Sequence, residues 1–167
     1  ANRGLSGVHQ PRQIGALLVN SPAQLRDRYR DLSDTKLVAT LATVRPDQHQ
    51  DPADTDTLHA LRSLARRCRL LGEEIADIET RMRARATATN PALMTVKGVG
   101  AVVGTQLLIT AGDNPDRLRS SASFAALCGT APIPVSSGRT DRHRLSRGGD
   151  RQANAALHHI VKVRLSY

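Results

Sequence analysis

Aromatic residues are nearly missing from this 167-residue sequence, which has two Tyr, one Phe and no Trp. A hydrophobic core must therefore be built from the aliphatic residues that dominate the 40% of apolar positions. Leu, Val, Ile and Ala suit closely packed helices better than a sandwich of aromatic-rich strands. The length allows one domain, or a small domain with a helical appendage. We therefore predict an all-α fold.

Cysteines and long apolar runs are also scarce. Cys68 and Cys128 each lie in an apolar pattern with no second thiol or histidine at ligand spacing. Both are predicted to be buried free thiols, which fits a reducing cytoplasm. No apolar run approaches the about 20 residues of a membrane-spanning helix, and no signal peptide is visible. Because the sequence begins without Met and ends within a predicted helix, we expect an excised piece of a longer protein.

Positive charge is what the sequence has in excess. It holds 24 Lys and Arg against 15 Asp and Glu, a formal net charge of +9. Such an excess favours polyanionic partners through phosphate neutralisation and counterion release. All but three of the cations are Arg, whose planar guanidinium matches phosphate and guanine, although a GC-rich genome also favours Arg codons. We predict nucleic acid as a partner and no membrane partner.

The first half of the sequence alternates short helical patterns with breakers. Residues 1–20 hold three glycines and Pro11 and are expected to be irregular. Ser21 is expected to cap a short helix with Pro22 at its first position. A second helix is expected from Ser33 to Val44.

A connector of two prolines and four aspartates follows at residues 45–56, and this composition is typical of a loop. The segment lacks the strand–helix–strand framework that would position metal ligands, so a solvated connector is the favoured interpretation. Its carboxylates belong to Asp47, Asp51, Asp54 and Asp56.

The longest periodic segment runs from Thr57 to about Ala88. Its apolar residues recur at steps of three and four, which places them on one seam of a helix about 45 Å long. Blocks of arginine and of carboxylate alternate on its outer surface. This pattern is typical of a solvated coiled-coil arm, and the arm can also pair with a partner arm across a DNA junction. The seam consists of Leu61, Ala65, Cys68, Leu71, Ile75, Ile78 and Met82.

A glycine-containing turn follows the end of this helix at Asn90-Pro91. Lys97, Gly98 and Gly100 precede the apolar run 101–111, a pattern typical of a helix-hairpin-helix motif. The glycines would let the backbone approach a phosphate, and the start of the next helix would face it. A tight turn between two helices stays an alternative. A dinucleotide-binding loop is disfavoured because no strand precedes the turn.

A serine pair lies in the most basic part of the sequence. We expect a short helix capped by Ser121 and stopped at Gly129, then a proline-stiffened loop with Ser136 and Ser137, and a last helix from near Asp150. A hydroxyl among guanidinium groups is what phosphoryl transfer to serine requires, although an ordinary turn explains Ser136 and Ser137 as well. The surrounding cations are Arg139, Arg142, His143, Arg144, Arg147 and Arg151, and His143 is a candidate base.

The string from Val99 to Arg164 resembles the C-terminal domain of the Piv-type, DEDD insertion-sequence transposases. This is family number one hundred and ten among insertion sequences, the bridge-RNA-guided serine recombinases. The resemblance extends over the whole sequence. It assigns residues 1–20 to the segment after a missing RuvC-like domain, 21–90 to a helical or coiled-coil region, and 91–167 to a C-terminally truncated transposase domain.

The resemblance implies a fragment of a DNA transposase that catalyses strand exchange. The family's nucleophilic serine maps to Ser137, with Ser136 as the nearest rival, and the arginines around it would line a nucleic-acid channel. A guide RNA, a homodimer or tetramer held by the helical arm, and a nucleoid-associated location are also implied. Mg²⁺ is expected in the RuvC-like domain, so the fragment alone is expected to be inactive. The alternative is a non-catalytic helix-hairpin-helix binding module.

Overall fold

The computed structural model describes residues 9–48, 51–113, 116, 118–146 and 148–166. Eight α-helices, one 3-10 helix and one two-stranded hairpin form the described part of the chain, which confirms the predicted all-α fold. The chain divides into two compact units, Ala1–Asp77 and Ile78–Tyr167. Among the described residues, no helix combines the length and the apolar character needed to cross a membrane.

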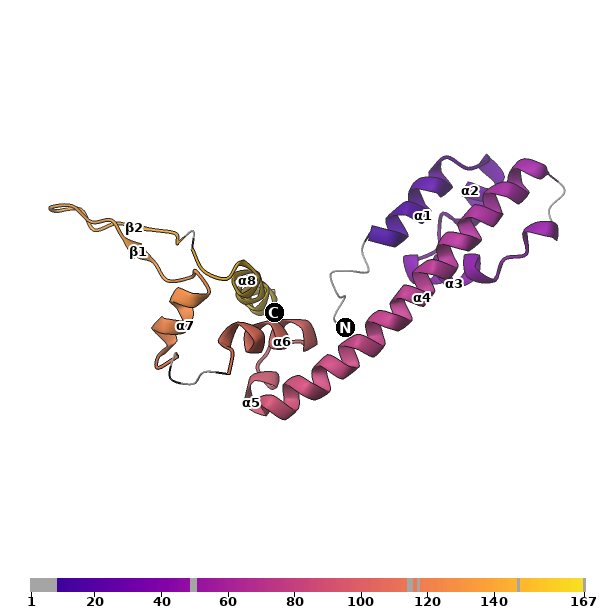
Figure 1. Cartoon of the computed structure of the whole chain (residues 1–167). Helices are drawn as coiled ribbons and strands as arrows, with labels where there is room; N and C mark the ends of the chain where they lie inside the picture. Colours follow the sequence, from indigo (N-terminus) through magenta and orange to yellow (C-terminus); the bar gives the residue numbers. More distant parts are fainter. Residues whose placement is uncertain (1–8, 49–50, 114–115, 117, 147, 167) are drawn as a thin grey trace. The chain divides into compact units, whose positions relative to one another are not determined.

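The first unit packs three short helices against the beginning of a long one (Figure 1). The short helices are α1 (His9–Val19), α2 (Ala23–Tyr29) and α3 (Asp34–Thr43), and a 3-10 turn, η1 (Pro46–Gln48), follows them. The long helix α4 (Pro52–Thr89) contains the predicted periodic segment. The core of this unit consists of Ile14, Leu18, Leu25, Tyr29, Leu37, Leu41, Ala42, Leu58, Leu61 and Ala65.

Three expectations for this unit are wrong. Residues 9–19 are helical rather than irregular, because burial of Ile14 and Leu18 outweighs the single interior Gly15; residues 1–8 lie outside the described part. Ser21 does not cap α2, since its hydroxyl donates to the Leu17 carbonyl oxygen of α1 at 2.8 Å.

The third wrong expectation is the loop predicted at residues 45–56. It ends at Pro52, where α4 begins, because the Asp51 carboxylate accepts a hydrogen bond from the Ala53 N–H at 2.9 Å. By contrast, α3 matches the predicted second helix to within one residue at each end.

The predicted seam of α4 changes its environment along the helix. Leu61 and Ala65 are fully buried in the core of the first unit, and Cys68 is half-buried at its edge. Further along, Ile78 is 50% exposed. The seam is therefore core at its beginning, while its later residues Leu71, Ile75 and Met82 are half-buried and Ile78 is exposed.

The second unit packs helices around α6 and α8. It contains the end of α4 and then α5 (Pro91–Met94), α6 (Ala101–Ala111), α7 (Ser121–Leu127) and α8 (Arg151–Leu165). The predicted helices 101–111 and from near Asp150 are thus confirmed. Strands β1 (Ile133–Pro134) and β2 (His143–Arg144) form an antiparallel hairpin between α7 and α8. The buried core is Val99, Leu107, Cys128, Ala153, Ala156 and Ile160.

Two details of this unit differ from expectation. Ser120, not Ser121, caps α7, because its hydroxyl oxygen accepts the Ser123 N–H at 3.2 Å. The proline-stiffened loop is a β-hairpin, described below. Cys128 is fully buried as predicted, and burial raises the pKa of its thiol, with a further rise from the nearby Asp150 carboxylate.

Candidate active site on the basic hairpin

Residues 131–146, which we call the basic hairpin, leave the helical core between α7 and α8 (Figure 1). Backbone contacts fix both of its ends to the core. The Asp150 N–H donates to the Leu127 carbonyl oxygen at 2.8 Å, and the Asn154 side-chain amide donates to the Cys128 carbonyl oxygen at 3.0 Å. The base of the hairpin is therefore tied to the end of α7 and the start of α8.

Asp150 connects this base to α6. One of its carboxylate oxygens accepts hydrogen bonds from the N–H groups of Gln152 and Ala153 and so caps α8. The other accepts the Thr110 hydroxyl at 2.6 Å. The Thr110 bond, followed by the backbone bonds, holds the pKa of the Asp150 carboxyl below its usual value.

A two-residue turn closes the hairpin and sets its register. Ser137 and Thr140 exchange both backbone hydrogen bonds, at 3.1 and 3.2 Å, around Gly138 and Arg139. Gly138 has a φ of +58°, and no described residue other than glycine has a positive φ. This combination is typical of a II′ turn, which requires glycine at its first central position. Pro134 then pairs with His143, and Ile133 with Arg144.

The register separates the two serines onto opposite faces. Side chains alternate along a strand, and residues that pair across the hairpin share a face. Ser136 therefore lies on the face of Asp141 and His143. Ser137 lies on the face of Arg142 and Arg144.

The serine hydroxyls also differ in their contacts. The Ser136 hydroxyl donates to the Asp141 carboxylate at 2.8 Å and accepts the Arg142 N–H at 3.3 Å. Within the described part of the chain, the Ser137 hydroxyl has no hydrogen-bond partner, and Ser137 is exposed. Ser136 thus stabilises the hairpin, whereas the Ser137 hydroxyl is available to a ligand. The Ser-Gly turn was the sequence signal that could have revealed the Ser136–Asp141 pairing.

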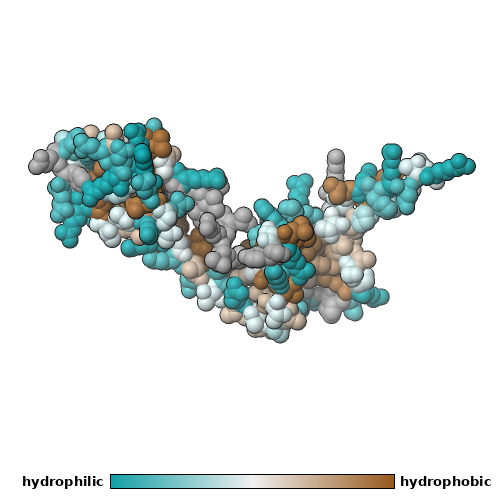
Figure 2. Space-filling model, turned by 180° about the vertical axis from the view of Figure 1, so that it is seen from behind, coloured by the Kyte–Doolittle hydropathy of each residue, from teal (hydrophilic) through white to brown (hydrophobic). Residues whose placement is uncertain are grey.

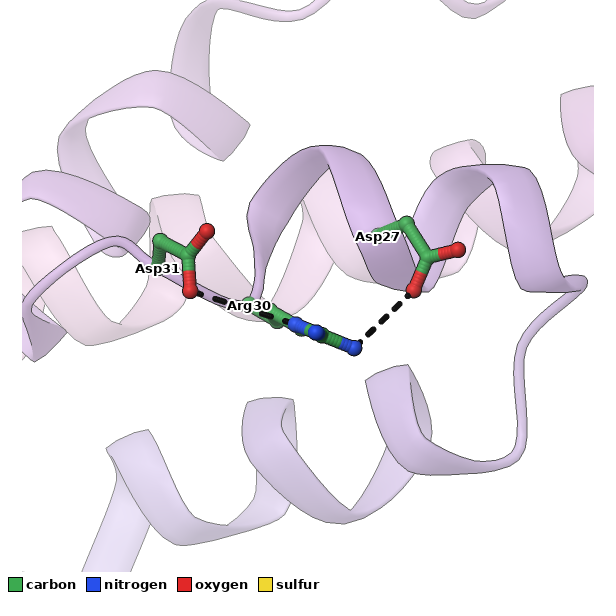
Figure 3. Close-up of polar contacts among 3 residues, drawn as sticks. All are labelled: Asp27, Arg30 and Asp31. Carbon is green, nitrogen blue, oxygen red and sulfur yellow. Dashed lines mark hydrogen bonds and ion pairs between the residues drawn. The ribbon is translucent and has the colours of Figure 1, made fainter.

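Exposed cations lie on both faces and in the turn of the hairpin. The described hairpin cations are all exposed, and none forms an ion pair with another described residue. Arg30 of the first unit is different, since its guanidinium lies between Asp27 at 3.3 Å and Asp31 at 3.9 Å (Figure 3). Hydrophilic side chains accordingly cover the projecting end of the hairpin (Figure 2). The hairpin cations are Arg139, Arg142, His143 and Arg144.

The other two predicted cations are not among the described residues of the hairpin. Arg151 is the first residue of α8 and is exposed, but it belongs to the core helix rather than to the hairpin. Arg147 lies outside the described residues. The described part of the hairpin thus holds four of the six predicted cations.

The glycine turn before α6 is covered by α8. Gly98 has a φ of +91°, and a Cβ there would lie 3.3 Å from the Ile160 backbone. The Arg164 side chain donates to the Lys97 carbonyl oxygen at 3.1 Å. Gly100 has an extended backbone that any residue adopts. Packing against α8 accounts for Gly98 without a ligand, so a phosphate contact of Lys97, Gly98 and Gly100 stays a prediction.

The residues present do not fit a metal centre. Within the described ranges, no three His, Cys, Asp or Glu side chains come together in a group that could hold a metal ion. The four aspartates of the predicted connector are divided between η1, the start of α4 and the residue before it. No metal-dependent step is therefore derived for these residues.

Residues 90–167 match the family model described as Transposase IS116/IS110/IS902 family. The match covers less than half of the chain and includes the basic hairpin with both serines. Over these residues the chain is similar to transposases of this family. No curated protein matches the chain.

Proposed function

We propose that this chain is the strand-joining part of a DNA transposase and that Ser137 is its nucleophile. The observation that carries the proposal is the exposed, unpaired Ser137 hydroxyl on a hairpin face shared with two guanidinium groups. The transposase match over the same residues supports it.

In the proposed step, the Ser137 oxygen attacks the phosphorus of a DNA phosphodiester. A bond between Oγ and phosphorus forms, and the bond between phosphorus and a deoxyribose oxygen breaks. Arg142 and Arg144 stabilise the negative charge on the phosphoryl oxygens. The serine proton passes to a base outside this face, since the register places His143 on the other one, and the departing oxygen takes up a proton.

The wider assembly is also part of the proposal. We assign the Mg²⁺ site to the RuvC-like domain that the resemblance implies, because the described residues do not supply one. The later part of the α4 seam, in which Leu71 and Ile75 are half-buried and Ile78 is exposed, supports pairing with a second copy. A guide RNA would share the cationic surface with DNA.

The experiment is to trap a covalent protein–DNA adduct in a transposase that contains this chain, and to locate it by peptide mapping. We expect the adduct on Ser137, and we expect Ser137→Ala to abolish strand exchange while DNA binding persists. Ser136→Ala is the matched control, because it removes the same hydroxyl from the opposite face. An adduct on any other residue would falsify the assignment.

The second candidate is a non-catalytic nucleic-acid-binding module. Its supporting observation is that the Ser137 backbone is fully used in the hairpin turn. In that case Ser137→Ala would recombine normally, and only removal of the hairpin arginines would reduce activity.

A further inference from the structure

A second cationic site lies in the first unit, outside the residues that match the transposase family. Four side chains of α4 line a shallow cavity of about 240 Å³: His59, Arg62, Ser63 and Arg66. Their spacing of three and four residues places them on one face of the helix.

Two contacts fix this face against the connection between α3 and η1. The Arg66 Nε–H donates to the Ala42 carbonyl oxygen at 3.2 Å, near the end of α3. His59 Nε2 lies 3.4 Å from a carboxylate oxygen of Asp47 in η1. These contacts give the cavity a defined wall, and Asp47 is the acidic residue at its His59 end.

The Arg62 guanidinium carries an unsatisfied donor. Its Nε atom is shielded from solvent and has no hydrogen-bond partner among the described residues. Neither Arg62 nor Arg66 forms an ion pair within this described part of the chain. Buried donors are almost always satisfied in folded proteins, since leaving one unpaired costs free energy. An anion in the cavity would satisfy this donor once the Arg62 side chain turns to present its Nε–H to the cavity.

We propose that this cavity binds one phosphodiester group of a nucleic-acid backbone. The phosphate oxygens would accept hydrogen bonds from Arg62 Nε and the Ser63 hydroxyl, and Arg66 would add positive charge. The volume is below the about 300–1,000 Å³ of pockets for drug-sized ligands, which suits a single phosphate rather than a whole cofactor. The net charge of +9 and the transposase match favour nucleic acid over an acidic peptide.

This site goes beyond the proposed strand-joining reaction. It would give the first unit its own binding site for the DNA or RNA backbone, separate from the basic hairpin. The contact would position the nucleic acid and carry no sequence information. Its existence does not depend on the role of Ser137.

The direct test follows the Arg62 Nε–H signal by NMR while dimethyl phosphate is added to the chain. We expect a saturable shift of this signal, with a smaller shift in Ser63→Ala. Acetate at equal ionic strength is the control for a carboxylate ligand. No saturable shift, or an equal response to acetate, would overturn the proposal.

The second test compares Arg62→Gln with Arg30→Gln, which removes the same charge from an ion-paired side chain of the same unit. We expect Arg62→Gln to weaken binding and to lower the salt slope by about 0.9 for duplex DNA or about 0.7 for single-stranded RNA. The nucleic acid whose salt slope changes, duplex DNA or single-stranded RNA, is the one that this site binds. Arg62→Lys is the control for folding, because it keeps the positive charge at this position. If binding is unchanged in Arg62→Gln, Arg62→Lys and Arg30→Gln alike, the proposal is overturned. Ser137→Ala should leave the Arg62 response intact, so the two proposals fail separately.

Discussion

Gly129 and Gly149 cross at the base of the basic hairpin, so closely that a Cβ on Gly149 would lie 2.5 Å from the Gly129 nitrogen. Both have a left-handed backbone, with φ values of +66° and +93°. Only glycine combines this conformation with such a close approach. The crossing holds the segment that leads into the hairpin against the segment that leads out of it.

Gly149→Ala is therefore expected to destabilise the second unit. Overpacking against backbone costs about 1–3 kcal/mol, and the positive φ adds to it. Urea unfolding measures the loss. Gly72→Ala is the control, because Gly72 lies in α4 with open space around its Cα and should gain about 0.5–1 kcal/mol. Equal stabilities of wild type and Gly149→Ala would contradict the role of the crossing.

Helices with a strong local signal could be predicted from the sequence. The seam of α4 has one clear periodicity, α6 is a continuous apolar run, and Asp150 marks the start of α8 as an N-cap. Helix α1 was missed because its glycine and proline suggested a loop, while its stability comes from burial of Ile14 in a core formed by distant residues. The local pattern was present, since Ile14, Leu17 and Leu18 have the three- and four-residue spacing of one helix face, but the glycine and proline outweighed it.

The candidate site was predicted in composition but not in geometry. The cluster of arginines around Ser137 is visible in the sequence. The separation of Ser136 from Ser137 depends on hairpin register, which follows only once Gly138 is recognised as the turn residue. The hydrogen bond between Thr110 and Asp150 joins residues 40 positions apart and could not be predicted.

Thr110→Val should reduce stability in a pH-dependent way. The Thr110 hydroxyl lowers the pKa of Asp150, so it stabilises the fold above the unperturbed aspartate pKa of about 3.9. This contribution is lost as pH falls through the lowered pKa, because both states then hold a protonated Asp150. Wild type and Thr110→Val should therefore differ most near neutral pH, and the difference should shrink as pH falls through the lowered pKa of Asp150.

Urea midpoints measured from neutral to acidic pH check this prediction. Asp150→Asn is the background control, since an amide does not titrate and Thr110→Val should then have a constant effect. A wild-type difference that stays constant down to the lowest pH would show that packing of Thr110, rather than its bond to the carboxylate, is what matters.

Ser136→Ala should loosen the hairpin without removing the nucleophile. The hydroxyl accepts the Arg142 N–H and donates to Asp141, so its loss should speed hydrogen exchange of the Arg142 amide. Strand exchange should fall but persist. Ser137→Ala should show the reverse pattern, with Arg142 exchange unchanged and strand exchange abolished. If the two variants behave alike in both measurements, the division of roles between the faces is wrong.

The hairpin arginines should set the salt dependence of DNA binding. Arg142 and Arg144 are exposed and share the Ser137 face, and neither has an ion-pair partner among the described residues. Removing one phosphate-binding guanidinium should lower the slope of log affinity against log salt by about 0.9. The double variant Arg142→Gln/Arg144→Gln should therefore show a decrease of about two such increments, measured by titration of a duplex at several salt concentrations. Arg30→Gln should leave the slope unchanged, because Asp27 and Asp31 already occupy its guanidinium. An unchanged slope in the double variant would mean that this face of the hairpin does not touch the DNA backbone.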